Sequence, residues 1–429
     1  MLDIELFRNN LEEIKESEKK RFKDPSNAQK VFDYDVKWRE VLQEIEDLRM
    51  RRNEISTKIG KLRKEGANEE AEEAIAQSKE LREKIEQLEK ERIDLYEKRE
   101  KFRYMVGNIL HKSVPVGEDE DLNDIVRVVG DKPSFTFDPL SHIDLIEKIE
   151  GADTKKASEV VGSRFYYLKG DIVLMNLALL HYALDKLIEK DYLPMWTPFF
   201  TKYEVMKAAA ELAEFEDQLY KIENEDLFMI ATSEQTLAAY HYDEIVDPER
   251  LPIKYAGISS CFRREAGSHG RDTLGIFRVH RFEKVEQFIF CKPKQSWLLH
   301  EELLSNSEEI FKELKLPYRI VNIASGELND NAAKKYDLEA WFPASKKYRE
   351  LVSCSNCLDY QARKLKIRMG KVGSTEAKEI VHTLNATAIA TERTICCILE
   401  NYQNEDHSIT IPDVLQKYMS GKKIIKPKI

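Results

Sequence analysis

The sequence predicts an α+β fold, in which an antiparallel sheet with grouped helices follows an N-terminal pair of long helices. Residues 41–109 carry apolar side chains at alternating steps of four and three, which is typical of helices that pack as a coiled coil. Beyond residue 113, stretches with a strand pattern come in runs joined by hairpins, and helical stretches are grouped between them. This order favours an antiparallel α+β domain. At 429 residues the chain exceeds the usual size of one domain, so at least two are expected.

Composition and charge narrow the class of protein. The formal net charge of −10 excludes a protein coated in basic surface, although local basic patches can still attract nucleic acid over about 10 Å. The charged share of 34% is typical of long exposed helices. Six scattered cysteines are too few for a disulfide scaffold and fit a reducing compartment. The acidic start at residues 1–5 and the lack of an apolar run of about 20 residues predict a cytoplasmic protein with no membrane span.

The N-terminal pattern predicts two helices joined by a short turn. Apolar positions of the first helix are Val41, Ile45, Leu48, Ile55, Ile59 and Leu62, and those of the second are Leu81, Ile85, Leu88, Leu95, Phe102, Val106 and Ile109. The sequence Gly66-Ala67-Asn68 interrupts the pattern between them. About 30 residues at roughly 1.5 Å each predict an antiparallel hairpin on the order of 45 Å long. The pattern alone leaves open a dimerisation coil or a projecting arm, and the seam positions of Arg52, Arg92 and Arg99 favour the arm.

A linker separates this hairpin from the rest of the chain. Pro115-Val116-Gly117 leads into the acidic stretch Glu118-Asp119-Glu120-Asp121, which has no periodicity. We therefore place the domain boundary near Ser113, with an N-terminal domain at residues 1–112 and a second domain at residues 113–429.

One helix and two strands are clearly predicted within the second domain. Residues 172–188 form a strongly apolar helical stretch. Residues 255–263 and 277–290 are predicted strands around a polar, glycine-bearing turn at residues 267–272. The charged residues of these strands then become candidates for a binding face.

Arg278, Phe282 and Glu286 are four residues apart, which would put all three on one face of the second strand. An arginine, an aromatic ring and a carboxylate suit a phosphate, a stacked base and a polar substrate group. The alternative is a solvated face of ordinary ion pairs, and a second strand with another arginine and glutamate alongside counts against it. The sequence contains neither GxxxxGK[ST] nor GxGxxG, so any bound nucleotide must be held by side chains of the sheet.

These segments resemble the sequence motifs of class II aminoacyl-tRNA synthetases in their seryl version. Phe262-Arg263-Arg264-Glu265, followed after the turn by residues 277–288, resembles the second motif of the class. Thr232-Ser233-Glu234 resembles the serine-binding triplet, and Pro198 resembles the first motif, which builds the dimer interface. Residues 382–395 resemble the third motif, and the N-terminal hairpin resembles the tRNA-binding arm. The resemblance covers nearly the whole chain.

The resemblance implies a homodimeric enzyme that forms seryl-adenylate from L-serine and ATP with Mg²⁺ and transfers serine to tRNA(Ser), with tRNA(Sec) also permitted. The segment Asn385-Ala386-Thr387-Ala388 is similar to the cytosolic eukaryotic and archaeal branch, so the family member is expected to be eukaryotic-type. The implied ATP-binding residues are Arg263, Arg264, Glu265, Arg278, Val279, His280, Phe282, Glu350, Leu351, Val352, Ser353 and Arg393. The implied serine-binding residues are Thr232, Ser233, Glu234, Arg263, Glu286, Asn385 and Thr387. Catalytic roles fall to Arg263, Glu350 and Arg393, and Mg²⁺ binding falls to Glu350 and Ser353.

The chemistry of this reaction explains the residue types. Joining a carboxylate to a phosphate brings two anions together, so positioned arginines do most of the catalytic work and no general base is required. Selection of serine needs buried polar groups that would be left unpaired if the substrate hydroxyl were missing. Arg281 stands where the family usually has glutamine, and the sequence assigns it no role.

Two other functions fit parts of the pattern. A paralogue that serves as a regulatory binding protein would keep the fold, but intact Arg263, Glu286, Glu350 and Arg393 count against it. An enzyme that charges a carrier protein would need no long arm to reach a tRNA. A tRNA-charging enzyme is therefore the predicted function.

Overall fold

The structure is a computed structural model that describes residues 1–209, 218–265, 274–371, 373 and 378–428. The polar turn predicted at residues 267–272 lies outside the described residues. The chain divides into two compact units, one of Leu2–Ile109 and one of Leu110–Ile429 together with Met1. The predicted domain boundary near Ser113 remains a prediction about where independent folding units divide.

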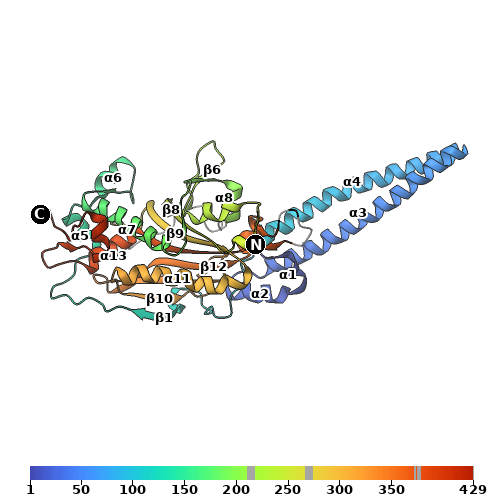
Figure 1. The fold of residues 1–429 in the computed structure, drawn as a ribbon. Helices are drawn as coiled ribbons and strands as arrows, with labels where there is room; N and C mark the ends of the chain where they lie inside the picture. The colour runs from blue at the N-terminus through green and yellow to red at the C-terminus, as the bar shows by residue number, and fades with distance from the viewer. Residues whose placement is uncertain (210–217, 266–273, 372, 374–377, 429) are drawn as a thin grey trace. The chain divides into compact units, whose positions relative to one another are not determined.

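The N-terminal unit is helical, and two of its helices are very long. Its helices are α1 (Ile4–Asn9), α2 (Leu11–Lys20), α3 (Ser26–Glu65) and α4 (Asn68–Tyr104). Helices α3 and α4 run side by side as an antiparallel hairpin (Figure 1), which confirms the prediction. Gly66 ends α3 with a φ of 75°, a left-handed conformation that costs glycine no strain. With 40 residues α3 is about 60 Å long, more than predicted, because it begins well before Val41.

Small apolar layers and one buried charge cluster hold the hairpin together. The apolar layers are Ile45, Leu48, Ile85 and Leu88 in one cluster, and Leu62, Ala71 and Ala74 in another. Arg99 occupies its seam position because its Nη1 donates to Oδ1 of fully buried Asp35 at 2.8 Å. Nε of Arg8 donates to Oδ2 of the same carboxylate at 2.7 Å. Nε of Arg39 also donates to Oδ2 of Asp35 at 3.0 Å, so three arginines satisfy a buried charge where an apolar layer would otherwise stand.

The C-terminal unit is built on an eight-stranded sheet with the order β1-β10-β11-β12-β15-β9-β8-β4. Neighbouring strands are antiparallel except for β4 and β8, which are parallel. The strands are β1 (Asp124–Val129), β4 (Leu193–Trp196), β8 (Ile253–Phe262), β9 (Arg281–Cys291), β10 (Tyr318–Asn322), β11 (Lys334–Phe342), β12 (Lys347–Leu358) and β15 (His382–Ala390). This sheet confirms the predicted α+β class.

Short strands form four further small sheets among the described residues of this unit. They pair β2 (Ala152–Asp153) with β3 (Tyr167–Leu168), β5 (Phe200–Lys202) with β6 (Leu227–Met229), β16 (Ile409–Thr410) with β17 (Ile424–Ile425), and β13 (Arg368–Met369) with both β7 (Ile245–Val246) and β14 (Glu379–Ile380). The pair β5 and β6 lies close to the strands that carry the candidate site, since the backbone N–H of Phe262 donates to the carbonyl of Ile230 just after β6.

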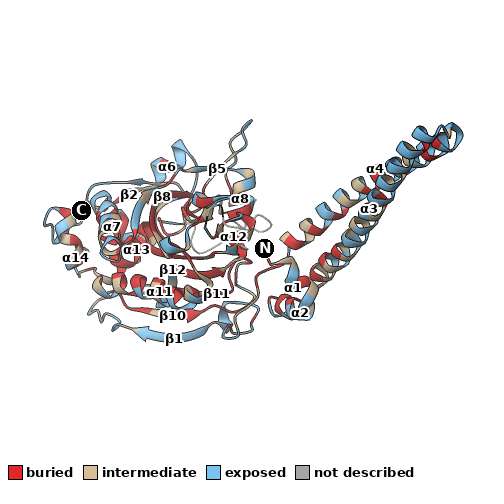
Figure 2. Cartoon of the chain, turned by 45° about the vertical axis from the view of Figure 1, so that its right-hand side comes forward, coloured by how far each residue is buried: buried red, intermediate tan, exposed pale blue. Residues whose placement is uncertain are grey.

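Helices cover the two faces of the large sheet unequally (Figure 2). The helices of this unit are α5 (His142–Lys148), α6 (Thr154–Val160), α7 (Asp171–Ile188), α8 (Tyr203–Ala209), α10 (Glu234–Ala238), α11 (Ser296–Glu313), α12 (Tyr360–Lys364), α13 (Thr391–Asn401) and α14 (Asp413–Gln416). The main core lies between one sheet face and helices α7, α11 and α13. Shorter helices α10 and α12 pack on the other face around Phe288 and Phe290 of β9. Among the described residues, no helix is long and apolar enough to cross a membrane.

The predicted second strand is too long at its N-terminal end. Strand β9 begins at Arg281, so Arg278 does not share a strand face with Phe282 and Glu286. The segment before β9 differs because Phe277 and Val279 are buried in the main core. The common face predicted for Arg278 is therefore wrong, whereas Phe282 and Glu286 do share one face of β9.

Candidate active site

The candidate site lies where β8, β9 and β15 run side by side. Thr387 of β15 is the register partner of Glu286 of β9, which pairs on its other side with Gly257 of β8. A Cβ atom on residue 257 would lie 2.6 Å from Cδ1 of Leu237 and 3.1 Å from the Ser233 hydroxyl. Only glycine therefore lets the Ser233 turn and helix α10 approach β8 this closely. The close approach brings the predicted serine-binding triplet beside the strands that carry Glu286 and Thr387.

Glu286 is the centre of one polar cluster. Its side chain is 2% exposed, and its Oε2 accepts a hydrogen bond from the Thr387 hydroxyl at 3.4 Å. Lys284, two residues earlier on the same strand face, forms an ion pair with the same oxygen. A buried carboxylate with a hydroxyl and an ammonium group beside it can hold a small polar ligand without exposing it to water.

Glu234 is the centre of a second polar cluster next to the first. Its Oε1 accepts hydrogen bonds from Nδ2 of Asn385 at 3.1 Å and from Nε2 of Gln361 at 2.8 Å. The Thr232 hydroxyl accepts a hydrogen bond from the backbone N–H of Glu234 at 3.2 Å. Burial and, after it, the negative charge of Glu286 raise the pKa of Glu234 to about 7. The two carboxylates therefore share one enclosed region.

The predicted nucleotide-binding side chains lie around Arg263, Glu350 and Arg393. Nη1 of Arg393 donates to the carbonyl and to Oε2 of Glu350, at 3.1 and 3.2 Å. The Arg263 guanidinium carbon is 5.1 Å from the centre of the Phe282 ring, and its Nε donates to the Ala231 carbonyl at 3.3 Å. Burial works to raise the pKa of Glu350, but the positive charges of Arg393, Lys335 and Arg263 outweigh it and hold that pKa below its usual range. The charge of Arg263 acts on Glu234 as well as on Glu350, so this arginine lies near both acids.

Oxygen ligands suitable for Mg²⁺ lie beside Arg393. Ser353 is the register partner of Asp337, and its hydroxyl hydrogen-bonds to the Asp337 carboxyl. The Oδ1 atom of Asp337 is buried and has no hydrogen-bond partner among the described residues. The carboxylate of Glu350, the hydroxyl of Ser353 and this orphan oxygen are of the hard type that Mg²⁺ prefers. The described residues contain no cluster of three or more acids, histidines or cysteines that could hold a metal alone, so Mg²⁺ here would need phosphate oxygens as well.

The second-motif residues before and after the turn have different surroundings. Nε of Arg278 and Oε2 of Glu265 form an ion pair at 3.0 Å. The His280 ring lies 2.8 Å from the Arg263 carbonyl, and the His280 backbone N–H donates to the Arg164 carbonyl at 3.1 Å. His280 thus supports the backbone that carries Arg263.

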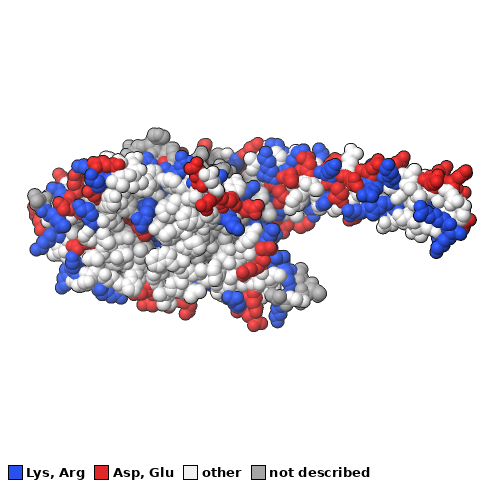
Figure 3. Space-filling model, turned by 90° about the horizontal axis from the view of Figure 1, so that it is seen from above, with Lys and Arg blue, Asp and Glu red and all other residues white. Residues whose placement is uncertain are grey.

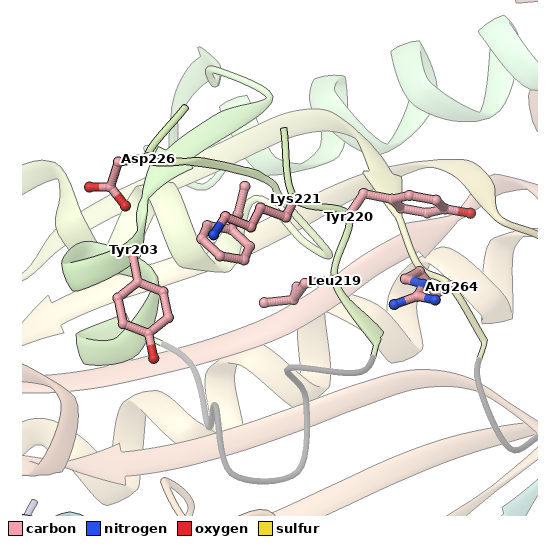
Figure 4. A pocket seen from close by; sticks show the side chains of 7 residues that line it. Tyr203, Leu219, Tyr220, Lys221, Asp226 and Arg264 are labelled. Atoms are coloured by element: carbon pink, nitrogen blue, oxygen red, sulfur yellow. The ribbon is translucent and has the colours of Figure 1, made fainter. Parts of the chain in front are cut away.

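Arg264 faces a separate set of side chains. It lines a cavity of about 690 Å³ together with Tyr203, Leu219, Tyr220, Lys221, Asp226 and Phe228 (Figure 4). Three other predicted ATP-binding residues, Val279, Leu351 and Val352, have their side chains buried in the main core, so only their backbone could meet a ligand. The structure thus shows the surroundings of each of these residues, and their ATP-binding roles stay predictions.

Sequence reasoning missed two residues of the site. Lys284 could have been found, because it lies an even number of residues from both Phe282 and Glu286. Gln361 could not, because it comes from α12, a short helix outside the recognised motifs. Its amide oxygen accepts a hydrogen bond from the Thr383 hydroxyl at 2.8 Å, which orients its Nε2 toward Glu234.

An antiparallel sheet that presents arginines and acids from two neighbouring motifs defines a class II aminoacyl-tRNA synthetase core. The family model described as the tRNA synthetase class II core domain for glycine, histidine, proline, serine and threonine matches residues 215–402. A second model, described as the seryl-tRNA synthetase N-terminal domain, matches residues 1–110. These two models meet on the same chain in the order that the motifs predicted.

Whole-chain comparisons narrow the class to one family. The chain is 58% identical over 429 residues to the serine–tRNA ligase of Methanosphaera stadtmanae, with all of both chains covered. A crystal structure of seryl-tRNA synthetase from Pyrococcus horikoshii complexed with ATP is 45% identical and has a TM-score of 0.96, with both chains fully covered. The cytoplasmic serine–tRNA ligase of Naegleria fowleri, solved in complex with AMP, is 42% identical with a TM-score of 0.90, covering 100% of this chain and 99% of that one. The chain belongs to the seryl-tRNA synthetases, the class II serine–tRNA ligases, which confirms the predicted family.

Proposed function

We propose that the face formed by β8, β9, β12 and β15 activates L-serine with ATP and then transfers the seryl group to tRNA(Ser). The observation that carries this proposal is the pair of neighbouring acid clusters around Glu286 and Glu234. Arg263 lies near Glu234 and also near Glu350, the acid on the nucleotide side. A serine molecule offers a hydroxyl, an ammonium and a carboxylate. Glu286 and Thr387 suit the hydroxyl, Glu234 and Thr232 suit the ammonium, and Arg263 suits the carboxylate.

In the first step, a carboxylate oxygen of serine attacks the α-phosphorus of ATP. The new C–O–P linkage forms as the bond from the α-phosphorus to the pyrophosphate oxygen breaks, and pyrophosphate leaves with the electron pair. The guanidinium fork of Arg263 offsets the repulsion between the two anions, so no proton needs to move. Mg²⁺, held by Glu350 and Ser353, would supply further positive charge to the phosphates.

The proposal assigns the outer end of ATP to Arg278 and Arg393, and the adenine ring to Phe282. In the structure each of these arginines is paired with an acid, Arg278 with Glu265 and Arg393 with Glu350. Phosphate oxygens can replace these acids as partners, because an arginine fork binds carboxylates and phosphates in the same geometry. When ATP binds, each arginine would therefore exchange a carboxylate partner for a phosphate partner, so neither arginine would be left without an anion.

In the second step, a hydroxyl of the terminal tRNA ribose attacks the carbonyl carbon of seryl-adenylate. The ester bond to ribose forms, AMP leaves with the electron pair of the mixed anhydride, and its phosphate can accept the hydroxyl proton. We assign tRNA(Ser) recognition to the α3–α4 hairpin, along which lysine, arginine and acidic side chains alternate (Figure 3). We also propose tRNA(Sec) as a second acceptor and the cytoplasm as the location, the latter supported by the name of the Naegleria fowleri relative.

We further propose that the enzyme is a homodimer that joins through the segment resembling the first motif. Large apolar side chains of this segment are exposed on α7 and on the edge strand β4, with Leu177 56%, Leu193 59% and Trp196 76% exposed. Figure 3 shows a broad face of the C-terminal unit with few charged side chains. Large exposed apolar side chains on a helix and an edge strand favour a second copy of the chain as their partner.

Serine-dependent exchange of labelled pyrophosphate into ATP tests the activation step. We expect exchange with serine and rejection of alanine by a factor on the order of 10⁴ in kcat/KM, because alanine would bury Glu286 and Thr387 without supplying the hydroxyl that completes their hydrogen bonds. The control is the same assay with threonine, which must be excluded by the size of the pocket. Absence of exchange with serine, or equal exchange with alanine, would refute the proposed pocket.

A further inference from the structure

Glu392 is a buried acid at the start of the helix that carries Arg393. It lies in the first turn of α13 and is 1% exposed. Its Oε1 accepts hydrogen bonds from the Tyr166 hydroxyl at 2.6 Å and from the backbone N–H of Glu283 at 3.1 Å. Its Oε2 accepts one from the Thr391 hydroxyl at 3.0 Å. No lysine, arginine or histidine forms an ion pair with Glu392 in the described part of the chain.

The partner that faces Glu392 is another carboxyl group, that of Glu283 on β9. Glu283 has a cationic partner in Arg281 and also accepts a hydrogen bond from the Ser260 hydroxyl at 3.2 Å. Burial raises the pKa of Glu392 well above its usual range, and the charge of Glu283 together with a hydrogen bond between the two side chains raises it further. Two adjacent carboxyl groups can share one proton. Arg281 has a role here as the cationic partner of Glu283, whereas Glu392 has no such partner among the described residues.

These contacts fasten the start of α13 to β9. The Thr391 hydroxyl also lies 3.3 Å from the Glu283 carbonyl, so its one proton is shared between that carbonyl and Oε2 of Glu392. Both residues before Arg393 are therefore anchored at the same point of the strand. Glu283 itself lies directly after Phe282 and three residues before Glu286. The anchor therefore relates Arg393 to the strand that carries the proposed adenine-stacking and serine-binding side chains.

We propose that Glu392 is a positioning residue, which as a neutral acid donates a hydrogen bond to the Glu283 carboxylate and so holds Arg393 at the nucleotide end of the site. The proposal rests on the role assigned to Arg393 in the proposed function. The alternative is an ionised Glu392, which the N-terminus of α13 would favour electrostatically. A glutamine at position 392 can replace the neutral acid, because its amide also donates a hydrogen bond. It cannot replace the ionised acid, which only accepts hydrogen bonds.

Glu392→Gln and Glu392→Ala in the full chain separate the two forms. Glutamine keeps a carbonyl oxygen for Tyr166 and the Glu283 N–H, and its amide donates to the Glu283 carboxylate as the neutral acid does. We expect Glu392→Gln to keep the KM for ATP within about twofold of wild type in pyrophosphate exchange. Glu392→Ala should raise the KM for ATP by about tenfold, the value of one buried hydrogen bond, with the KM for serine changed by less than about twofold.

Glu400 supplies the matched control on the same helix. It is also 1% exposed, and its carboxyl accepts from the Ala344 backbone N–H at 3.1 Å and contacts the His142 ring at 2.8 Å. Glu400→Ala should lower the Tm, as Glu392→Ala does, but leave the KM for ATP unchanged. An equal rise in the KM for ATP in both alanine variants would overturn the proposal, because α13 would then need only general stability.

The pH dependence gives a second readout that a purely structural role would not move. The titratable groups facing Glu392 are Tyr166, Glu283 and Cys396, and the charge of Arg281 acts on Tyr166 and Glu283. Ionising Glu392 at alkaline pH sets two carboxylates side by side, so the wild-type KM for ATP should rise with pH while that of Glu392→Gln stays level. A Glu392→Gln variant as impaired as Glu392→Ala would overturn the neutral-acid assignment.

Arg393→Ala distinguishes failure of this inference from failure of the proposed function. We expect Arg393→Ala to raise the KM for ATP, and we expect Glu392→Ala to add little to it in the double variant, because both act through one side chain. If Arg393→Ala leaves the KM for ATP unchanged, the nucleotide role of Arg393 is wrong. If Arg393→Ala raises it but Glu392→Ala alone does not, only the positioning role of Glu392 falls.

Discussion

Glu286→Gln tests the serine pocket at its centre. Glutamine has nearly the volume of glutamate and keeps a carbonyl oxygen for the Thr387 hydroxyl, but it removes the negative charge. Glu286 is 2% exposed and its ion-pair partner Lys284 is 7% exposed. The substitution therefore leaves a buried ammonium group without its carboxylate, in addition to weakening the contact with the serine hydroxyl.

The two consequences have different magnitudes and different readouts. Breaking a buried ion pair by removing one partner costs about 3–5 kcal/mol of folding free energy, which should lower the Tm. Losing a hydrogen bond to a charged group costs about 1.5–3 kcal/mol in transition-state binding. That loss corresponds to a fall of about 10- to 150-fold in kcat/KM for serine. The KM for ATP should change by less than about twofold, because Glu286 faces the serine end of the site.

The double variant Glu286→Gln/Lys284→Met separates stability from activity. With both charges gone, the Tm should recover toward the wild-type value, whereas serine-dependent pyrophosphate exchange should stay low. Thermal denaturation and exchange kinetics on the same preparations measure the two effects. Wild-type kcat/KM for serine in Glu286→Gln would refute the pocket assignment, and a double variant as unstable as the single one would refute the buried-ion-pair account.

Three further predictions concern Glu234, the dimer and the arm. The pKa of Glu234 is raised from 4.5 to about 7, so its stabilising contribution is complete below about pH 4.5 and is lost as the pH rises through 7. In the proposed pocket its ionised form holds the serine ammonium, so the KM for serine should fall as the pH rises through 7, and Glu234→Gln should abolish that dependence in exchange assays. Trp196→Asp should convert the proposed dimer to a monomer in light scattering, because it places a charge on the apolar β4 edge, and an intact dimer would contradict the proposed interface. Deletion of residues 35–100 should preserve pyrophosphate exchange but impair charging of tRNA(Ser), and normal charging would show that the hairpin does not recognise the tRNA.

The sequence predicted the parts of the site that lie within one strand or one motif. Alternation along a strand is local, so Phe282 and Glu286 were placed on a common face correctly. The same reasoning failed for Arg278, because β9 begins only at Arg281. The apolar neighbours of Arg278, Phe277 and Val279, are buried in the main core without being part of the strand. Hydrophobic residues that serve tertiary packing are indistinguishable from strand residues in a short window.

Contacts between distant segments were outside the reach of sequence reasoning. Gln361 reaches Glu234 across 127 residues of chain, and no spacing in the sequence relates them. Gly257 is needed because the Cδ1 methyl group of Leu237 packs over it. This contact exists only after α10 has packed on β8, so the sequence does not reveal it. The sequence assigned no role to Arg281. In the structure it is the cationic partner of Glu283, whose backbone and side chain face Glu392 and Tyr166 from distant parts of the chain.

The α3–α4 hairpin is held together by separate clusters along its length, so its length can change without disturbing all of them. Its apolar clusters are separate and each involves only residues facing one another across the two helices. Adding or removing one heptad in both helices would therefore shift the turn at Gly66 by about 10.5 Å while leaving the charge cluster around Asp35 intact. The length of the hairpin can thus be changed in steps of one heptad, and a series of such insertions would test how its length affects charging of tRNA, if the hairpin recognises tRNA as proposed.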